Sequence, residues 1–157
     1  MSSADKIILD HIALSERLKS GPGPVVFTNG CFDIVHRGHV SYLERAATLG
    51  ATLVVAINSD RSVQTLNKGS NRPLNPLDDR LAVVAALECV NWVTAFDEST
   101  PARLISTLMP NCLVKGGDWP VKEIVGAEEV IANGGQVHSL PFEFDRSTTA
   151  LIERIRR

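Results

Sequence analysis

The chain has 157 residues, of which 44% are hydrophobic, and a formal net charge of −2. This length suits one domain that buries roughly two-thirds of its unfolded surface. The charge argues against a general nucleic-acid binder, which is usually basic, and no apolar run approaches the ~20 residues that span a membrane. The cysteines Cys31, Cys89 and Cys112 lack metal-ligand spacing, and nothing before Val25 resembles a signal peptide. We therefore expect a reduced, cytoplasmic protein with neither a nucleic-acid nor a membrane partner.

Residues 1–22 are expected to form a helical extension ahead of the main domain. Ile8, Ile12 and Leu18 lie among charged residues between positions 5 and 18, a pattern typical of a short amphipathic helix. The Gly-Pro-Gly-Pro run at 21–24 ends this helix. Residues 23–157 then make up the main domain.

Strand and helix patterns alternate through the main domain. The predicted strands are the apolar runs that begin at Val25, Leu53, Trp92, Cys112 and Gln136. The predicted helices run from His39 to Ala47, from Asn75-Pro76 to Ala85, from Thr100-Pro101 to Leu108, over 127–132, and from a Ser147 cap through Leu151, Ile152 and Ile155 on an inward face. This alternation predicts an α/β fold, a Rossmann-like doubly wound five-stranded parallel sheet with helices on both faces.

The segment from Val25 to His39 carries the strongest functional signal. A buried strand is expected to end in a turn at Asn29-Gly30, and His36 and His39 then stand three residues apart at a helix start. A helix N-terminus favours anions, and two histidines on one helical face can hold one phosphate chain. Gly38 removes the side chain that would keep a nucleotide from the backbone.

Polar residues also follow the other predicted strands. In open parallel sheets ligands bind beyond the carboxyl ends of the strands, so these residues are expected to converge on one rim. They are Asn58 to Asp60 after the second strand, Lys115 to Asp118 at the fourth, and Ser147 to Thr149 after the fifth, with the cations Lys68 and Arg72 on a polar loop. Positive charge and fixed donors of this kind are what phosphoryl and nucleotidyl transfer require.

Most of these residues also have a plainer explanation. Ser147 can be only a helix cap, Lys68 and Arg72 only solvated loop charges, and Asp33 only the cap of its own turn. Arg80 can pair with Asp78 or Asp79 on its own helix. The chain has no P-loop, no G-x-G-x-x-G after the first strand and no Ser-His-Asp or zinc constellation, which disfavours kinase-type ATPases and dinucleotide oxidoreductases.

Residues 29–39, Asn-Gly-Cys-Phe-Asp-Ile-Val-His-Arg-Gly-His, are similar to the G-x-F-D-x-x-H-x-G-H signature of the nucleotidylyltransferase superfamily. Residues 147–149 match the S-T-T of its second motif. Within that superfamily the chain most resembles the adenylyltransferases that act on D-glycero-β-D-manno-heptose 1-phosphate, through residues 68–76, 113–118 and 145–149. The likeness extends from Val25 to Ile155.

The resemblance implies transfer of the adenylyl group of ATP to D-glycero-β-D-manno-heptose 1-phosphate, giving ADP-heptose and pyrophosphate for lipopolysaccharide core or a related glycan. It implies Mg²⁺, bound mainly through the ATP phosphates, and a sugar kinase on a separate protein. We assign no metal-ligating residue from the sequence, and we expect a homodimer. The implied catalytic residues are His36, His39, Lys68, Arg72 and Lys115. The implied nucleotide-binding residues are Thr28, Asn29, Gly30, Phe32, Gly38, Asn58, Asp60, Gly117, Asp118, Ser147, Thr148 and Thr149.

Two alternatives stay open. The first is a cytidylyltransferase acting on glycerol 3-phosphate or another polyol or sugar phosphate. Such enzymes carry R-T-x-G-I before S-T-T, where this chain has Phe-Glu-Phe-Asp-Arg at 142–146. That departure, with glycines at 116–117 able to expose backbone groups to adenine, favours ATP over CTP. The second alternative is a nucleotide sensor without activity, which the intact histidines and S-T-T disfavour.

Overall fold

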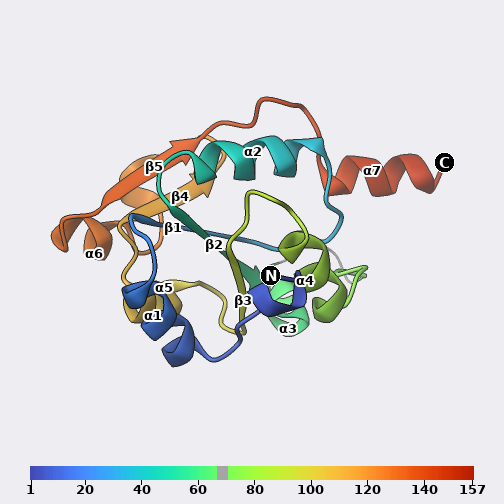
Figure 1. The fold of residues 1–157 in the computed structure, drawn as a ribbon. Helices are drawn as coiled ribbons and strands as arrows, with labels where there is room; N and C mark the ends of the chain where they lie inside the picture. The colour runs from blue at the N-terminus through green and yellow to red at the C-terminus, as the bar shows by residue number, and fades with distance from the viewer. Residues whose placement is uncertain (67–70) are drawn as a thin grey trace.

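The computed structural model describes residues 1–66 and 71–157 (Figure 1). Its centre is a five-stranded sheet in the order β3-β2-β1-β4-β5, with every neighbouring pair of strands parallel. The strands are β1 (Val25–Gly30), β2 (Thr52–Asn58), β3 (Trp92–Phe96), β4 (Cys112–Gly116) and β5 (Gln136–Leu140). The predicted Rossmann-like parallel sheet is confirmed. The predicted site residue Lys68 lies outside the described residues.

Helices cover both faces of this sheet, as predicted. The elements are η1 (Ala4–Lys6), α1 (His11–Ser20), α2 (Arg37–Ala47), α3 (Asp60–Gln64), α4 (Leu77–Ala85), α5 (Ala102–Leu108), η2 (Val121–Glu123), α6 (Ala127–Ala132) and α7 (Thr148–Ile155). Successive strand side chains point to opposite faces, so Val26 packs with Leu43 of α2 and Leu81 of α4. Phe27 packs on the other face, in one cluster with residues of α1, α5 and α6.

The N-terminal segment differs from the single helix expected between residues 5 and 18. The chain forms η1, then an extended stretch in which Ile7 bridges to Val93, and α1 begins only after Asp10, which accepts N–H bonds from Ile12 and Ala13. Leu14 is completely buried in the cluster that contains Phe27. Residues of 1–22, expected as an extension, therefore contribute to the core of the main domain.

Two helix starts lie later than predicted. Neither Asn75 nor Thr100 caps a helix: α4 and α5 begin after Pro76 and Pro101, and no side chain caps either helix. Helix α3 was not expected, and it forms because the hydroxyl of Ser59 accepts a hydrogen bond from the Ser62 N–H. The chain after β2 thus turns straight into a helix instead of a loop.

Helix α7 extends away from the body of the domain (Figure 1). The predicted cap is confirmed, since the Ser147 hydroxyl accepts from the Ala150 N–H. The predicted inward face is wrong, because no residue of α7 is buried: Leu151 is 36% exposed and Ile155 is 74% exposed. Among the residues that the structure describes, no helix is long and apolar enough to cross a membrane.

Candidate active site

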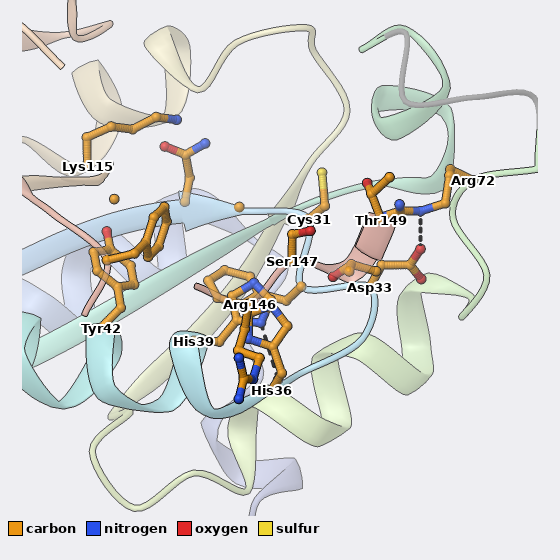
Figure 2. Close-up of a pocket in the computed structure, with 16 residues that line it drawn as sticks. Cys31, Asp33, His36, His39, Tyr42, Arg72, Lys115, Arg146, Ser147 and Thr149 are labelled. Atoms are coloured by element: carbon orange, nitrogen blue, oxygen red, sulfur yellow. Dashed lines mark hydrogen bonds and ion pairs between the residues drawn. The ribbon is translucent and has the colours of Figure 1, made fainter. Parts of the chain in front are cut away.

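A pocket of about 360 Å³ opens beyond the carboxyl ends of β1 and β4 (Figure 2). In the strand order the chain leaves β1 toward β2 on one side and reaches β4 on the other, so the pocket lies where the winding reverses, the usual ligand position in such sheets. Predicted site residues that line it are Asn29, Gly30, Phe32, His36, His39, Arg72, Lys115, Ser147, Thr148 and Thr149. Segments more than a hundred residues apart thus meet at one site.

The two histidines stack at the start of α2, with ring centroids 3.9 Å apart. His36 Nδ1 accepts the Gly38 N–H at 3.1 Å, and His39 Nδ1 accepts the His36 N–H at 3.4 Å. A ring nitrogen that accepts a hydrogen bond carries no proton, so each neutral imidazole has its proton on Nε2. The helix start therefore fixes both rings in the form that offers an N–H donor.

Arg146 lies beside the histidine pair and lines the same pocket (Figure 2). Burial lowers the pKa of His36 below its usual value, and the positive charge of Arg146 lowers it further. Both effects favour the neutral imidazole, the state in which Nδ1 can accept the Gly38 N–H.

The turn between β1 and α2 is closely packed. Phe32 has a left-handed backbone conformation, with φ of 48°, and its ring lies 5.2 Å from that of His39. A Cβ on Gly30 would lie 2.9 Å from the Phe32 ring, and one on Gly38 would lie 3.0 Å from the His36 ring. Gly38 does not line the pocket. The absence of a side chain at Gly38 makes room for the imidazole of His36, and its expected role toward a nucleotide stays a prediction.

Lys115 and Gly116 form the β4 wall of the pocket, but the next two residues do not line it. Gly117 turns the chain at φ +112°, and the Ser139 hydroxyl donates to its carbonyl oxygen at 2.7 Å. The indole N–H of Trp119 donates to the Gly116 carbonyl at 3.2 Å. Gly117 and Asp118 thus lie outside this pocket. The carbonyl oxygens of Gly116 and Gly117, whose backbone groups were expected to face adenine, each accept one hydrogen bond from within the chain.

Three other predicted nucleotide-binding residues also lie outside the pocket. Thr28 is buried below it and shares a 2.5 Å hydrogen bond with the hydroxyl of Tyr42, whose pKa burial raises to about 12. Asn58 is buried and donates to the Ser62 hydroxyl. Asp60 pairs with Arg80, with 2.7 Å between its Oδ1 and the arginine Nη2.

Arg80 is fully buried and does not pair with Asp78 or Asp79, so the pairing predicted within its own helix is wrong. Its guanidinium donates to three backbone carbonyl oxygens, those of Cys31 at 2.7 Å, Asn58 at 2.8 Å and Asn75 at 3.0 Å. Together with Asp60, these contacts join the chain after β1, the end of β2 and the segment before α4 beneath the pocket.

The segment between β5 and α7 lies along α2 (Figure 1). Arg45 donates to the Pro141 carbonyl at 2.7 Å and lies 3.7 Å from the Glu143 carboxylate. The guanidinium of Arg37 lies 3.8 Å above the Phe144 ring. These contacts direct the chain back to the pocket, where Arg146 and the cap of α7 follow.

Six residues that line the pocket were not predicted as site residues, namely Cys31, Asp33, Tyr42, Gly116, Phe142 and Arg146. Two of them left a usable signal. Tyr42 follows His39 by three residues and so shares its helical face, and Arg146 is a cation directly before the S-T-T hydroxyls. Phe142 left none, because its place depends on the path of the segment along α2.

The chain is similar to known proteins over most of its length. A model of the cytidylyltransferase-like family matches residues 27–154. A D-beta-D-heptose 1-phosphate adenylyltransferase of Bordetella bronchiseptica is 52% identical, covering 100% of this chain and 99% of its own. The bifunctional protein HldE of Shewanella loihica is 60% identical over 93% of this chain, which spans 31% of that longer relative.

Solved structures show the same architecture. A lipopolysaccharide core biosynthesis protein from Thermoplasma volcanium superposes with a TM-score of 0.62 at 26% identity, covering 77% of this chain and 98% of its own. A pantothenate synthetase from Thermus thermophilus superposes with a TM-score of 0.61 at 16% identity, covering 86% of this chain and 61% of its own, a likeness in fold alone.

The Arg80 network predicts a large stability loss in Arg80→Met. Removal of the guanidinium leaves the Asp60 carboxylate and three carbonyl oxygens without their donor, which is expected to lower the free energy of unfolding by about 3–5 kcal/mol. Chemical denaturation measures this. Arg61→Met is the control, because the Arg61–Asp97 pair is exposed and solvent-screened pairs contribute little to stability. Similar losses in the two variants would contradict the prediction.

The surroundings of His36 predict a titration midpoint below the ordinary histidine value of about 6.5. Arg146→Ala removes a nearby positive charge that opposes protonation, so the midpoint is expected to rise toward that value while burial keeps it below. Imidazole proton shifts measured by NMR against pH, without nucleotide, give both midpoints. A wild-type midpoint above 6.5, or no change in Arg146→Ala, would show that these surroundings do not control the proton on His36.

Proposed function

This chain belongs to the cytidylyltransferase-like family, and we propose that it transfers the adenylyl group of ATP to D-glycero-β-D-manno-heptose 1-phosphate, releasing pyrophosphate. The observation that carries the proposal is the Bordetella bronchiseptica relative, named as a heptose 1-phosphate adenylyltransferase and matched at 52% identity over nearly its whole length. The pocket supports it with two stacked imidazoles, three cations and a capped helix start around one space.

In the proposed reaction a phosphate oxygen of the sugar attacks the α-phosphorus of ATP. The new P–O bond forms as the bond from the α-phosphorus to the bridging oxygen breaks, and the electron pair leaves with pyrophosphate. No covalent enzyme intermediate is needed, so the protein acts by holding the reactants in line and stabilising charge.

The residues take their roles from their positions. His36 and His39 donate from Nε2 to oxygens of the α-phosphate, where negative charge increases during the reaction. Lys115 adds positive charge from the β4 wall. The backbone N–H groups at the start of α7, after the Ser147 cap, receive the departing pyrophosphate. Arg72 lines the same pocket and adds a further positive charge (Figure 2).

We assign Mg²⁺ to the phosphates of ATP. Among the described residues no group of three or more His, Cys, Asp or Glu side chains could hold a metal ion, and the Asp33 carboxylate in the pocket already accepts three donors. The ion would supply neutralisation of the polyphosphate charge.

We also propose that the protein is a homodimer in the cytoplasm. Light scattering after size-exclusion chromatography measures its oligomeric state.

Replacing either active-site histidine is expected to abolish most turnover without unfolding the protein. His36→Ala and His39→Ala each remove one fixed donor, and losses of this kind lower kcat by ~10²–10³. Pyrophosphate release with ATP, heptose 1-phosphate and Mg²⁺ measures kcat, and thermal unfolding checks the fold. His138→Ala is the control, since His138 lies on β5 outside the pocket. A wild-type kcat in His36→Ala or His39→Ala would show that the substituted histidine does not act in catalysis. ATP binding without turnover by the wild-type protein would support the nucleotide-sensor alternative.

The enzyme is expected to prefer ATP to CTP. The triphosphates are identical, so discrimination must come from hydrogen bonds to the base edge and from the shape of the base site. The carbonyl oxygens of Gly116 and Gly117 each already accept one hydrogen bond and keep one further lone pair for a base. The measurement is kcat/KM for each nucleotide at fixed heptose 1-phosphate and Mg²⁺. Equal values, or a preference for CTP, would replace the adenylyl assignment with the cytidylyl alternative.

A further inference from the structure

Asp33 connects two segments that are far apart in the sequence and that meet at the pocket. Its carboxylate accepts Arg72 Nε at 2.5 Å, the Leu74 N–H at 2.9 Å and the Asn75 N–H at 2.8 Å. The Asn75 side-chain amide donates in return to the Asp33 backbone carbonyl. The residue therefore does not cap its own turn, as one expectation had it, but fastens the segment before α4 to the turn after β1.

This carboxylate is charged although its side chain has no exposed surface. Burial raises the pKa of Asp33, but the N–H groups of Asn75 and Leu74 and the Arg72 guanidinium outweigh it, so the pKa lies below the usual value. At neutral pH Asp33 thus presents a full negative charge to Arg72.

The contact to Arg72 uses one particular nitrogen. Asp33 holds Nε, and Nη1 and Nη2 take no part in that contact. The Arg72 side chain is 9% exposed, and it lines the pocket together with Thr149 (Figure 2). Because a guanidinium is a planar fork of five donors, fixing Nε fixes the direction of the other two nitrogens.

We propose that Asp33 is a positioning residue for ATP, which acts by holding Arg72 through Nε so that its Nη1 and Nη2 face the polyphosphate. This inference rests on the proposed function for the identity of the ligand. A carboxylate in an anion-binding pocket ordinarily repels an anionic ligand. The Asp33 carboxylate is instead paired with Arg72 and with the N–H groups of Leu74 and Asn75, which belong to the segment that it positions. Because the Arg72 side chain is already held in place, less conformational entropy is lost when ATP binds.

A double-mutant cycle on ATP binding tests this inference. Calorimetric Kd values for ATP with Mg²⁺ are measured for the wild type, Asp33→Asn, Arg72→Ala and the double variant. Asp33→Asn is expected to weaken ATP binding roughly ten-fold, the scale of one hydrogen bond to a charged group. In the Arg72→Ala background it is expected to add less than about two-fold, because its route to the ligand is gone.

Asp97→Asn is the matched control. Asp97 also pairs with an arginine, Arg61, but at the exposed surface outside the pocket, so the Kd for ATP is expected not to change. An equal loss from Asp33→Asn with and without Arg72 would overturn the inference and make Asp33 a structural anchor only. An unchanged Kd in Asp33→Asn would overturn it as well.

Arg72→Lys keeps the inference testable if Asp33→Asn does not fold. Lysine keeps the charge but has one nitrogen, which cannot bind Asp33 and a phosphate in the fixed arrangement of a fork. Weaker ATP binding is expected, and wild-type affinity would overturn the inference. If the wild type binds ATP but does not transfer the adenylyl group, the proposed reaction is refuted and the double-mutant cycle still tests the role of Asp33. If the wild type binds no ATP, both the proposed reaction and the role of Asp33 are refuted.

Discussion

The buried guanidinium of Arg80 is the constraint on which the pocket depends. A buried cation without partners destabilises a protein by several kcal/mol, so its acceptors must all be in place when the chain folds. Those acceptors are the carbonyl oxygens of Cys31, Asn58 and Asn75 and the carboxylate of Asp60. They belong to the ends of β1 and β2, to the start of α3 and to the chain before α4. One side chain thereby fixes the relative positions of the segments beneath the pocket.

The buried ion pair of Asp33 with Arg72 continues this arrangement into the lining of the pocket. Arg80 ties the Asn75 carbonyl to the strand ends, and Asp33 ties the N–H of the same residue to the turn that precedes His36. The short segment before α4 is therefore held from both sides of its backbone. The position of Arg72, the cation of this segment, is therefore fixed without a ligand. Stabilisation of charge in a transition state requires preorganisation of this kind.

The sequence predicted what depends on local patterns. Apolar runs located all five strands, and the rule that ligands bind at the carboxyl ends of parallel strands predicted that His36 and Ser147 would meet. It did not predict the partner of Arg80, because Asp78 and Asp79 are near in sequence whereas Asp60 is near only in the fold. Asn75 contacts Asp33 and does not cap α4, again because its partner is distant in the sequence. Asn58 and Asp60 lie outside the pocket, and the roles of the predicted site residues stay predictions.

Both sequence motifs that line the pocket are connected to one helix. His36 and His39 stand at the start of α2, and the same helix holds the chain that leads to Ser147 through Ser41, Arg45 and Arg37. Helix α2 and the start of α7 are therefore mechanically coupled on one side of the pocket, while Lys115 belongs to the sheet on the other. A displacement of α2 relative to the sheet is therefore expected to carry both motifs in the same direction relative to Lys115.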